Sequence, residues 1–321
     1  MSAKPVVWIT RKLSDNTEAR ALRDYDVILN PQDKTSSAED IIAMSHKVDA
    51  IIPCHSELFD ADVTAKLGDR LKIIANHSVG VDHCDLPALR NRGITVTNTP
   101  DVLSDATAEI AMLLMLGAAR RAIEGDSLVR SGQWDSWSPA FMVGKQVTGK
   151  RLGIIGMGKV GQVMAQRGRG FDMTVHYHNR TRLPEHLECN AIYHDTIESL
   201  LGVSDYLSLH CPATETTAGL INSETLALLP DGAILVNTAR GALVDESSLI
   251  DAIETGKLSA AGIDCFQTEP VGNPAFAKHQ NIFTLPHIGS ATAETRDAMG
   301  FRALDNLDAF FAGSTPHDKL V

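Results

Sequence analysis

Three glycines stand at the spacing of a phosphate-binding loop: Gly156, Gly158 and Gly161 in the segment RLGIIGMGKVG. In a G-x-G-x-x-G turn the first glycine permits a tight bend, the second lets backbone N–H groups approach phosphate, and the third allows close helix packing. The positive end of the following helix favours the negative charge. We expect the loop to hold the pyrophosphate of a dinucleotide; the alternative is an ordinary strand-to-helix turn. The residues between the glycines that would share this role are Met157, Lys159 and Val160.

The next strand-like segment ends about 20 residues past this loop, where the ribose of a bound dinucleotide is normally recognised. NAD-binding units usually carry Asp or Glu there, but this chain has Asn179, followed by Arg180, Thr181 and Arg182. The missing carboxylate removes repulsion toward a 2′-phosphate, and guanidinium groups can bind that phosphate. The sequence therefore predicts NADPH as the preferred cofactor and NADH as the alternative. The competing explanation is that both arginines are solvated loop residues.

Three more candidates follow later strand-like segments: Arg240 in NTARG, Glu269 in DCFQTEP and His287 in PHIGSAT. The carboxyl ends of parallel strands line the ligand crevice of an open α/β sheet, so these three side chains can converge there. Taken singly, each has an ordinary explanation. Arg240 could form a surface ion pair, Glu269 could be a solvated loop residue, and His287 could be a histidine with satisfied hydrogen bonds.

Short apolar segments that alternate with helix-like segments are expected to place these residues on two doubly wound parallel sheets. Between residues 6 and 97 the expected strands are VVWIT, YDVILN, DAIIP, LKIIAN and ITVT. From Leu152 onward, where the glycine loop begins, further strands are expected at residues 173–178, 206–210, 233–237, 260–264 and 281–285. One long, mostly buried helix is expected over residues 105–123, and a last helix over about residues 291–312.

This pattern predicts a Rossmann nucleotide domain, residues 101–290, inserted into a discontinuous flavodoxin-like substrate-binding domain, residues 1–100 and 291–321. Two linkers at one hinge suggest closure around a substrate.

Composition restricts the partners of this 321-residue chain. Lys and Arg number 29 against 40 Asp and Glu, a formal net charge of -11, which disfavours nonspecific nucleic-acid binding. The five cysteines lack metal-like pair spacing and indicate reduced cytosolic thiols. No export segment or membrane-length apolar run is present in the sequence. We expect a soluble, cytoplasmic protein with a small-molecule partner, no membrane or nucleic-acid partner and no metal.

In their order along the chain, the motifs resemble those of the D-isomer-specific 2-hydroxyacid dehydrogenases. They are HSVGVDHCDL at residues 77–86, TAE at 107–109, GMGKVG, HCPAT at 210–214, NTARG, DCFQTEP and PHIGSAT. Within that family, W-x-x-W-x-P from Trp134 to Pro139 and the Asn-Arg-Thr at residues 179–181 look most like glyoxylate and hydroxypyruvate reductases.

The resemblance implies hydride transfer from a nicotinamide to a small 2-oxo acid such as glyoxylate or hydroxypyruvate. Arg240 would bind the substrate carboxylate and polarise the ketone. His287 would donate a proton to the ketone oxygen, while Glu269 would orient the imidazole and favour its protonated form. Backbone N–H groups of Val79 and Gly80 would complete the carboxylate site.

The resemblance also implies that Asp264 contacts the nicotinamide carboxamide. Thr107, Pro212 and Thr238 lie in motifs near the cofactor. Ordinary roles stay open for several of these residues: a turn at Gly80, a strand-end cap at Asp264 and a helix start at Thr107.

Trp134 and Trp137 are equally well explained as packing or dimer-contact residues and as walls of a substrate pocket. By analogy with the family, the apolar helix and the arm that follows it suggest a homodimer.

Two alternatives remain open. One is a dehydrogenase for another D-2-hydroxy acid, of the lactate or gluconate type. The other is a non-catalytic NAD(P)-sensing corepressor with the same fold. A formate dehydrogenase would be expected to carry Gln at position 269, and the chain lacks the regulatory extension of many phosphoglycerate enzymes.

Overall fold

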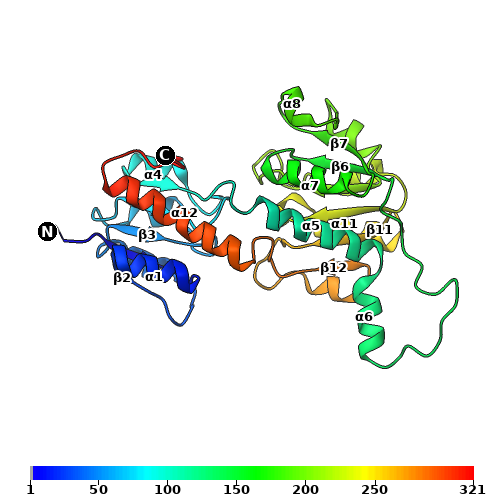
Figure 1. Cartoon of the computed structure of the whole chain (residues 1–321), viewed down its shortest axis with the longest axis horizontal. Coiled ribbons are helices and arrows are strands. Elements are labelled where there is room, and N and C mark those ends of the chain that lie inside the picture. Colours follow the sequence, from blue (N-terminus) through cyan, green and yellow to red (C-terminus); the bar gives the residue numbers. More distant parts are fainter. Residues whose placement is uncertain (1–2) are drawn as a thin grey trace. The chain divides into compact units, whose positions relative to one another are not determined.

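The computed structural model describes residues 3–321, which divide into two compact units, each built on a parallel sheet (Figure 1). Of the described residues, the first unit comprises 3–103 and 291–321, and the second comprises Ser104–Ser290. Every strand pairing in both sheets is parallel. The expected fold class of two parallel-sheet α/β domains is confirmed.

The first unit has a five-stranded sheet in the order β2-β1-β3-β4-β5. This is the flavodoxin-like order, in which the strand sequence reverses between β1 and β3. Its strands are β1 (Val6–Ile9), β2 (Asp26–Ile28), β3 (Ala50–Ile52), β4 (Ile73–Ala75) and β5 (Thr95–Thr97). Its helices are α1 (Asp15–Asp24), α2 (Ala38–Ser45), α3 (Ala61–Ala65), α4 (Leu86–Asn91) and α12 (Ala293–Phe311).

Alternation along these strands produces two cores, one on each face of the first sheet. Ile52 and Ile73 face the cluster that includes Leu304 and Leu307 of α12. Ile51 belongs to the opposite cluster, with residues of α2, α3 and α4. Helices therefore cover both faces, so the strand ends are where this sheet can present polar groups to a ligand.

The second unit has a seven-stranded sheet in the order β12-β11-β10-β9-β6-β7-β8. The order reverses beside β6, as in Rossmann dinucleotide-binding folds. The strands are β6 (Arg151–Ile155), β7 (Thr174–His178), β8 (Ile192–Tyr193), β9 (Tyr206–Leu209), β10 (Ala233–Asn237), β11 (Leu258–Ile263) and β12 (Ile282–Thr284). The helices are α5 (Ser104–Ala119), α6 (Ala122–Arg130), α7 (Lys159–Arg169), α8 (Glu185–Glu188), α9 (Ile197–Leu201), α10 (Ser223–Leu228) and α11 (Glu246–Glu254), with short 3-10 turns η1 (Gly241–Leu243) and η2 (Pro274–Lys278).

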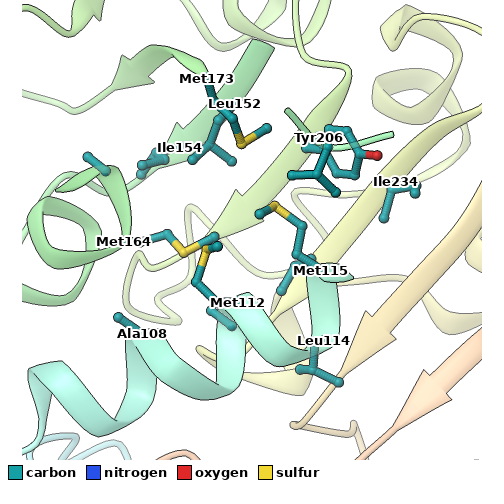
Figure 2. Packing of buried hydrophobic residues seen from close by; sticks show 14 of the residues in the cluster. Ala108, Met112, Leu114, Met115, Leu152, Ile154, Met164, Met173, Tyr206 and Ile234 are labelled. Atoms are coloured by element: carbon teal, nitrogen blue, oxygen red, sulfur yellow. The ribbon is translucent and has the colours of Figure 1, made fainter. Parts of the chain in front are cut away.

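The core between α5, α7 and the second sheet is rich in methionine (Figure 2). Met112 and Met115 of α5 and Met164 of α7 are buried against the strands, where flexible thioethers fill irregular gaps. Gly262 of β11 brings α5 close, because a Cβ there would lie 2.6 Å from the Cβ of Leu114. This packing fixes the strand ends that carry the candidate site.

The single helix predicted over residues 105–123 is wrong, because the chain breaks after Ala119. The Lys145 N–H donates to the Ala119 carbonyl at 2.7 Å, and a Cβ on Gly144 would overlap that same carbonyl oxygen. Arg121 then takes a left-handed φ of +55°, and α6 begins at the next residue. The apolar pattern continues across the break, so the sequence contains no local signal for a contact made by residues more than twenty positions later.

Strand positions agree with expectation to within one or two residues at most ends, whereas the two-residue edge strand β8 was not predicted. Between residues 3 and 321, no helix has the length and apolar character needed to cross a membrane.

Candidate active site

Arg240, Glu269 and His287 follow three neighbouring strands, β10, β11 and β12, at the carboxyl edge of the second sheet. The His287 Nδ1–H donates to Glu269 Oε2 at 2.6 Å. The other carboxylate oxygen accepts the Phe266 N–H at 2.9 Å, which orients Glu269. Because Nδ1 is engaged by the carboxylate, Nε2 is the nitrogen that can exchange a proton with a substrate.

The backbone around His287 is held in an uncommon conformation by a buried carboxylate. His287 has a φ of +54°, in the left-handed region that non-glycine residues rarely adopt. The two N–H groups that follow it, those of Ile288 and Gly289, donate to Asp264 Oδ1 and Oδ2 at 2.9 and 2.8 Å. Burial raises the pKa of Asp264, while these N–H groups oppose the shift. Asp264 therefore clamps the loop that presents the imidazole, and its expected contact with a nicotinamide stays a prediction.

Asn237, at the end of β10, shapes the loop that presents Arg240. Its fully buried side chain donates to the Arg240 carbonyl at 2.8 Å and accepts the Ala239 N–H at 3.0 Å. A Cβ on Gly241 would overlap the Phe266 backbone, so glycine lets this loop contact the loop of Glu269. Sequence reasoning missed Asn237; an amide at the end of an otherwise apolar strand was the available signal.

The glycine loop has room for a phosphate. A Cβ on Gly156, whose φ is +94°, would collide with the Cys211 backbone, and one on Gly161 would overlap the Gly156 carbonyl. A Cβ on Gly158 would meet no atom within 4 Å. Gly158 also precedes α7 without a side-chain cap hydrogen bond, and the positive end of this helix favours an anion. These observations fit a dinucleotide pyrophosphate at the loop.

The residues after β7 differ in their availability to a cofactor. Asn179 Oδ1 accepts the Met157 N–H at 2.6 Å, so this side chain supports the glycine loop. Arg182 makes a two-point ion pair with Glu188 at 2.8 and 3.0 Å. Arg180 is exposed and has no ion-pair partner within residues 3–321. Of the two arginines, Arg180 is therefore the one whose charge is available to a ligand.

The partner of Arg182 is itself part of a network. Glu188 Oε1 also accepts the Tyr177 hydroxyl at 2.5 Å, and the Arg182 guanidinium lies 5.5 Å from the centre of the Tyr193 ring. Arg182 and Tyr177 hold the pKa of Glu188 at about 2. Thr181 is exposed next to this network.

The remaining expected cofactor residues lie at or near the carboxyl edge of the second sheet. Thr238 is buried, and its hydroxyl has no hydrogen-bond partner in the described part of the chain. Thr107 on α5 is buried close to Gly289, and Pro212 follows β9. Nearby, His210 Nε2 lies 2.8 Å from Ser208 Oγ, and burial lowers the pKa of this histidine to about 4. The Thr238 hydroxyl is thus buried without a partner at the same carboxyl edge of the sheet that carries the glycine loop. Such a hydroxyl is suited to a hydrogen bond with a bound cofactor.

Val79 and Gly80 follow β4 in the first unit. Their carbonyl groups accept hydrogen bonds from Asn98 Nδ2 at 2.9 Å and Ser78 Oγ at 2.8 Å. Their N–H groups have no acceptor within residues 3–321. The carbonyl groups of this loop are therefore already hydrogen-bonded, whereas its two N–H groups remain as donors for an anion.

Comparison with known proteins adds independent information. Residues 112–289 match the family model of the D-isomer specific 2-hydroxyacid dehydrogenase NAD binding domain. The chain is 42% identical over 314 residues to glycerate dehydrogenase of Hyphomicrobium methylovorum, covering 97% of this chain and 98% of the relative. It is 41% identical over 318 residues to glyoxylate reductase of Thermococcus litoralis, covering 98% and 96%.

A solved structure extends the likeness. It is the NADPH-dependent glyoxylate/hydroxypyruvate reductase of Sinorhizobium meliloti in complex with NADP and malonate, with a TM-score of 0.88 and 28% identity. The match covers 99% of this chain and 97% of that one.

Proposed function

We propose that this chain, which belongs to the D-isomer specific 2-hydroxyacid dehydrogenase family, reduces small 2-oxo acids such as glyoxylate and hydroxypyruvate. The main support is the 2.6 Å contact between His287 Nδ1 and Glu269, on strand ends next to that of Arg240. An imidazole oriented by a carboxylate is suited to proton transfer, and a neighbouring guanidinium is suited to binding a carboxylate.

The proposed roles follow from what each side chain can do. Arg240 binds the substrate carboxylate through its planar fork and polarises the adjacent ketone. His287 donates the proton on Nε2 to the ketone oxygen, and Glu269 stabilises the imidazolium before that transfer. A bound nicotinamide supplies the hydride to the carbonyl carbon. The hydride and the proton together convert the ketone to a secondary alcohol.

The first unit supplies further donors in this proposal. The N–H groups of Val79 and Gly80, which have no acceptor within residues 3–321, would bind the same substrate carboxylate. Because these N–H groups are neutral, they would orient the carboxylate through hydrogen bonds without adding positive charge.

We further propose NADPH as the preferred cofactor. Asn179 places no carboxylate near a 2′-phosphate, and Arg180 is uncommitted, whereas Arg182 is already paired with Glu188. The Sinorhizobium meliloti relative is named NADPH-dependent, which supports the same choice. Arg180 is therefore proposed as the main phosphate contact.

The proposed active form is a homodimer. Several large apolar side chains of α6 and the arm after it are exposed, including Val129 at 59%, Trp137 at 74% and Val143 at 64%. Val143 also lines a hollow together with Leu116 and Phe141, and Figure 1 shows α6 and the arm extending from the second sheet. Exposed apolar surface of this kind is typical of an interface.

The deciding experiment measures initial rates with a panel of 2-oxo acids, each with NADPH and with NADH. We expect the highest kcat/KM for glyoxylate or hydroxypyruvate with NADPH. No oxidation of either cofactor by any member of the panel would contradict the enzyme assignment. Higher kcat/KM with NADH would contradict the cofactor assignment alone.

A further inference from the structure

Arg296 is a partly buried cation in the first turn of α12, in the first unit. Its guanidinium has no hydrogen bond or ion pair to any of residues 3–321. Removing a charge from water without pairing it is costly, and the positive end of a helix adds repulsion. Burial accordingly lowers the pKa of Arg296. The protein carries a cation in a place that its own groups do not stabilise.

The groups around Arg296 do not supply a counter-ion. His77 Nε2 lies 3.4 Å from the Arg296 carbonyl oxygen, and burial together with the guanidinium lowers the pKa of His77 to about 4. Burial raises the pKa of the nearby Cys54 thiol to about 12. Both side chains are therefore uncharged at neutral pH.

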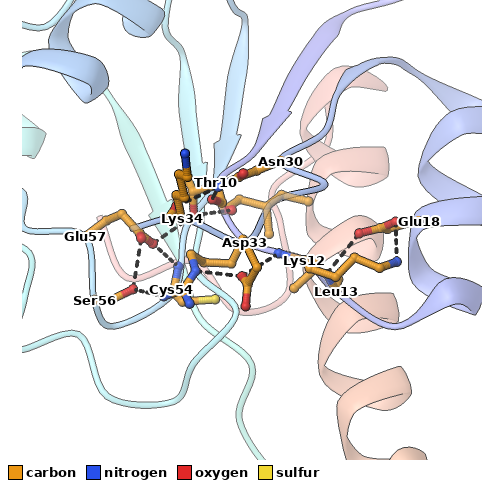
Figure 3. Close-up of polar contacts among 12 residues, drawn as sticks. Thr10, Lys12, Leu13, Glu18, Asn30, Asp33, Lys34, Cys54, Ser56 and Glu57 are labelled. Carbon is orange, nitrogen blue, oxygen red and sulfur yellow. Dashed lines mark hydrogen bonds and ion pairs between the residues drawn. The ribbon is translucent and has the colours of Figure 1, made fainter. Parts of the chain in front are cut away.

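The carboxylates near the ends of β1 and β3 have other partners (Figure 3). Glu57 accepts hydrogen bonds from the Thr10 hydroxyl at 2.8 Å and the Cys54 N–H at 2.9 Å. Asp33 accepts the Arg11 Nε–H at 2.8 Å. Neither of these carboxylates is paired with Arg296. The positive charge of Arg296 is therefore available to an anion from outside the chain.

Arg296 also lies at the edge of the sheet where ligands bind. Cys54 follows β3, and His77 leads from β4 into the loop with the two unpaired N–H groups, those of Val79 and Gly80. In open α/β sheets the carboxyl ends of the strands form the ligand crevice. A cation and free backbone donors thus belong to the same edge of one unit.

We propose that Arg296 is a further anion contact of the substrate carboxylate, in addition to the N–H groups of Val79 and Gly80 that the proposed function already assigns to it. The identity of that anion rests on the proposed function, but the site itself is built wholly from the first unit.

The test uses the full chain and the variants R296Q and R296K, with R90Q as the matched control. Arg90 is an exposed arginine of the same unit, so R90Q removes the same charge without touching the site. Calorimetry measures malonate binding to the nucleotide-free protein, and steady-state kinetics measures KM and kcat for glyoxylate at saturating NADPH. Malonate is the probe because it carries two carboxylates and no ketone.

For R296Q we expect the malonate Kd and the glyoxylate KM to rise about tenfold or more, with kcat changed by less than about threefold. R296K, which keeps a point charge, should be intermediate, and R90Q should match the wild type. We also expect the Tm of ligand-free R296Q to equal or exceed that of the wild type, because no partner is lost.

An unchanged malonate Kd and an unchanged KM in R296Q would overturn the inference while leaving the proposed reaction intact. Equal losses in R296Q and R90Q would also overturn it, since they would indicate a general charge effect. If the wild type reduces no 2-oxo acid but R296Q still loses malonate binding, the anion site stands and the proposed function fails.

Discussion

In the proposed reaction His287 is the proton donor, and its contact with Glu269, 18 positions earlier, occupies one ring nitrogen. We predict that H287A lowers kcat for glyoxylate reduction about 10²- to 10⁴-fold, the usual contribution of a general acid. The far-ultraviolet circular dichroism and Tm should stay close to wild type, because the ring is partly exposed. Near-normal turnover in H287A would refute the assignment.

R240A should likewise lose activity by orders of magnitude, because the substrate carboxylate would lose a binding partner and the ketone would no longer be polarised.

The two arginines after β7 have different proposed roles, Arg180 in cofactor recognition and Arg182 in holding the local structure. We predict that R180Q lowers kcat/KM for NADPH about 10- to 100-fold, as expected for losing a charge-assisted contact, and leaves the NADH value nearly unchanged. R182Q serves as the comparison, because its charge is paired with Glu188. It should have the smaller effect on NADPH and lower the Tm slightly. A larger NADPH loss in R182Q than in R180Q would contradict this division.

Among the structural elements, the turn from β6 into α7 contains one glycine that packing requires, Gly161, and one that is proposed to face the cofactor, Gly158. We predict that G161A destabilises the protein by about 1–3 kcal/mol, because its methyl group would overlap the Gly156 carbonyl. G158A should keep the wild-type Tm, since a Cβ there meets no atom within 4 Å. It should nevertheless weaken cofactor binding, because that methyl group would occupy the space of the phosphate. Thermal unfolding and cofactor fluorescence titration distinguish the two effects.

The loops that follow the strands of the second sheet carry the candidate site, and buried polar side chains hold these loops in place. Asp264 accepts two backbone N–H groups after His287, and Asn237 makes two hydrogen bonds in the loop of Arg240. These buried polar side chains serve loops that the strand pattern alone does not describe. Positions of the strands could be predicted from apolar runs, whereas the loop geometry depends on such contacts.

At the scale of the whole molecule, the exposed apolar arm leads to a prediction about assembly. We predict that V129E converts a dimer to a monomer by light scattering, because a carboxylate in a buried interface would be unpaired. Val129 is 59% exposed on α6, and L22E at a similarly exposed position, 52%, is the control. A wild-type monomer, or dissociation in both variants, would argue against this interface.

The discontinuous first unit is also a property of the whole chain. The segment after residue 290 returns to it, and α12 packs against the same sheet face as α1. Arg302 of α12 pairs with the nearly buried Asp318 at 2.6 Å, which ties the end of the chain to this helix.

The parallel α/β class, the glycine loop and the order of the candidate residues can be read from the sequence alone, because they depend on local patterns and short spacings. Which side chains pair with one another is evident only in the folded chain. Folding joined Glu269 to His287, committed Arg182 to Glu188, ended α5 at Ala119 through Lys145, and left Arg296 without a partner. Most of these outcomes depend on where residues distant in the chain, or adjacent strand ends, come to lie in space, and the pairing of Arg182 with Glu188 depends on how the short segment between them folds. Charge and hydropathy patterns do not encode those contacts position by position, so they became visible only in the folded protein.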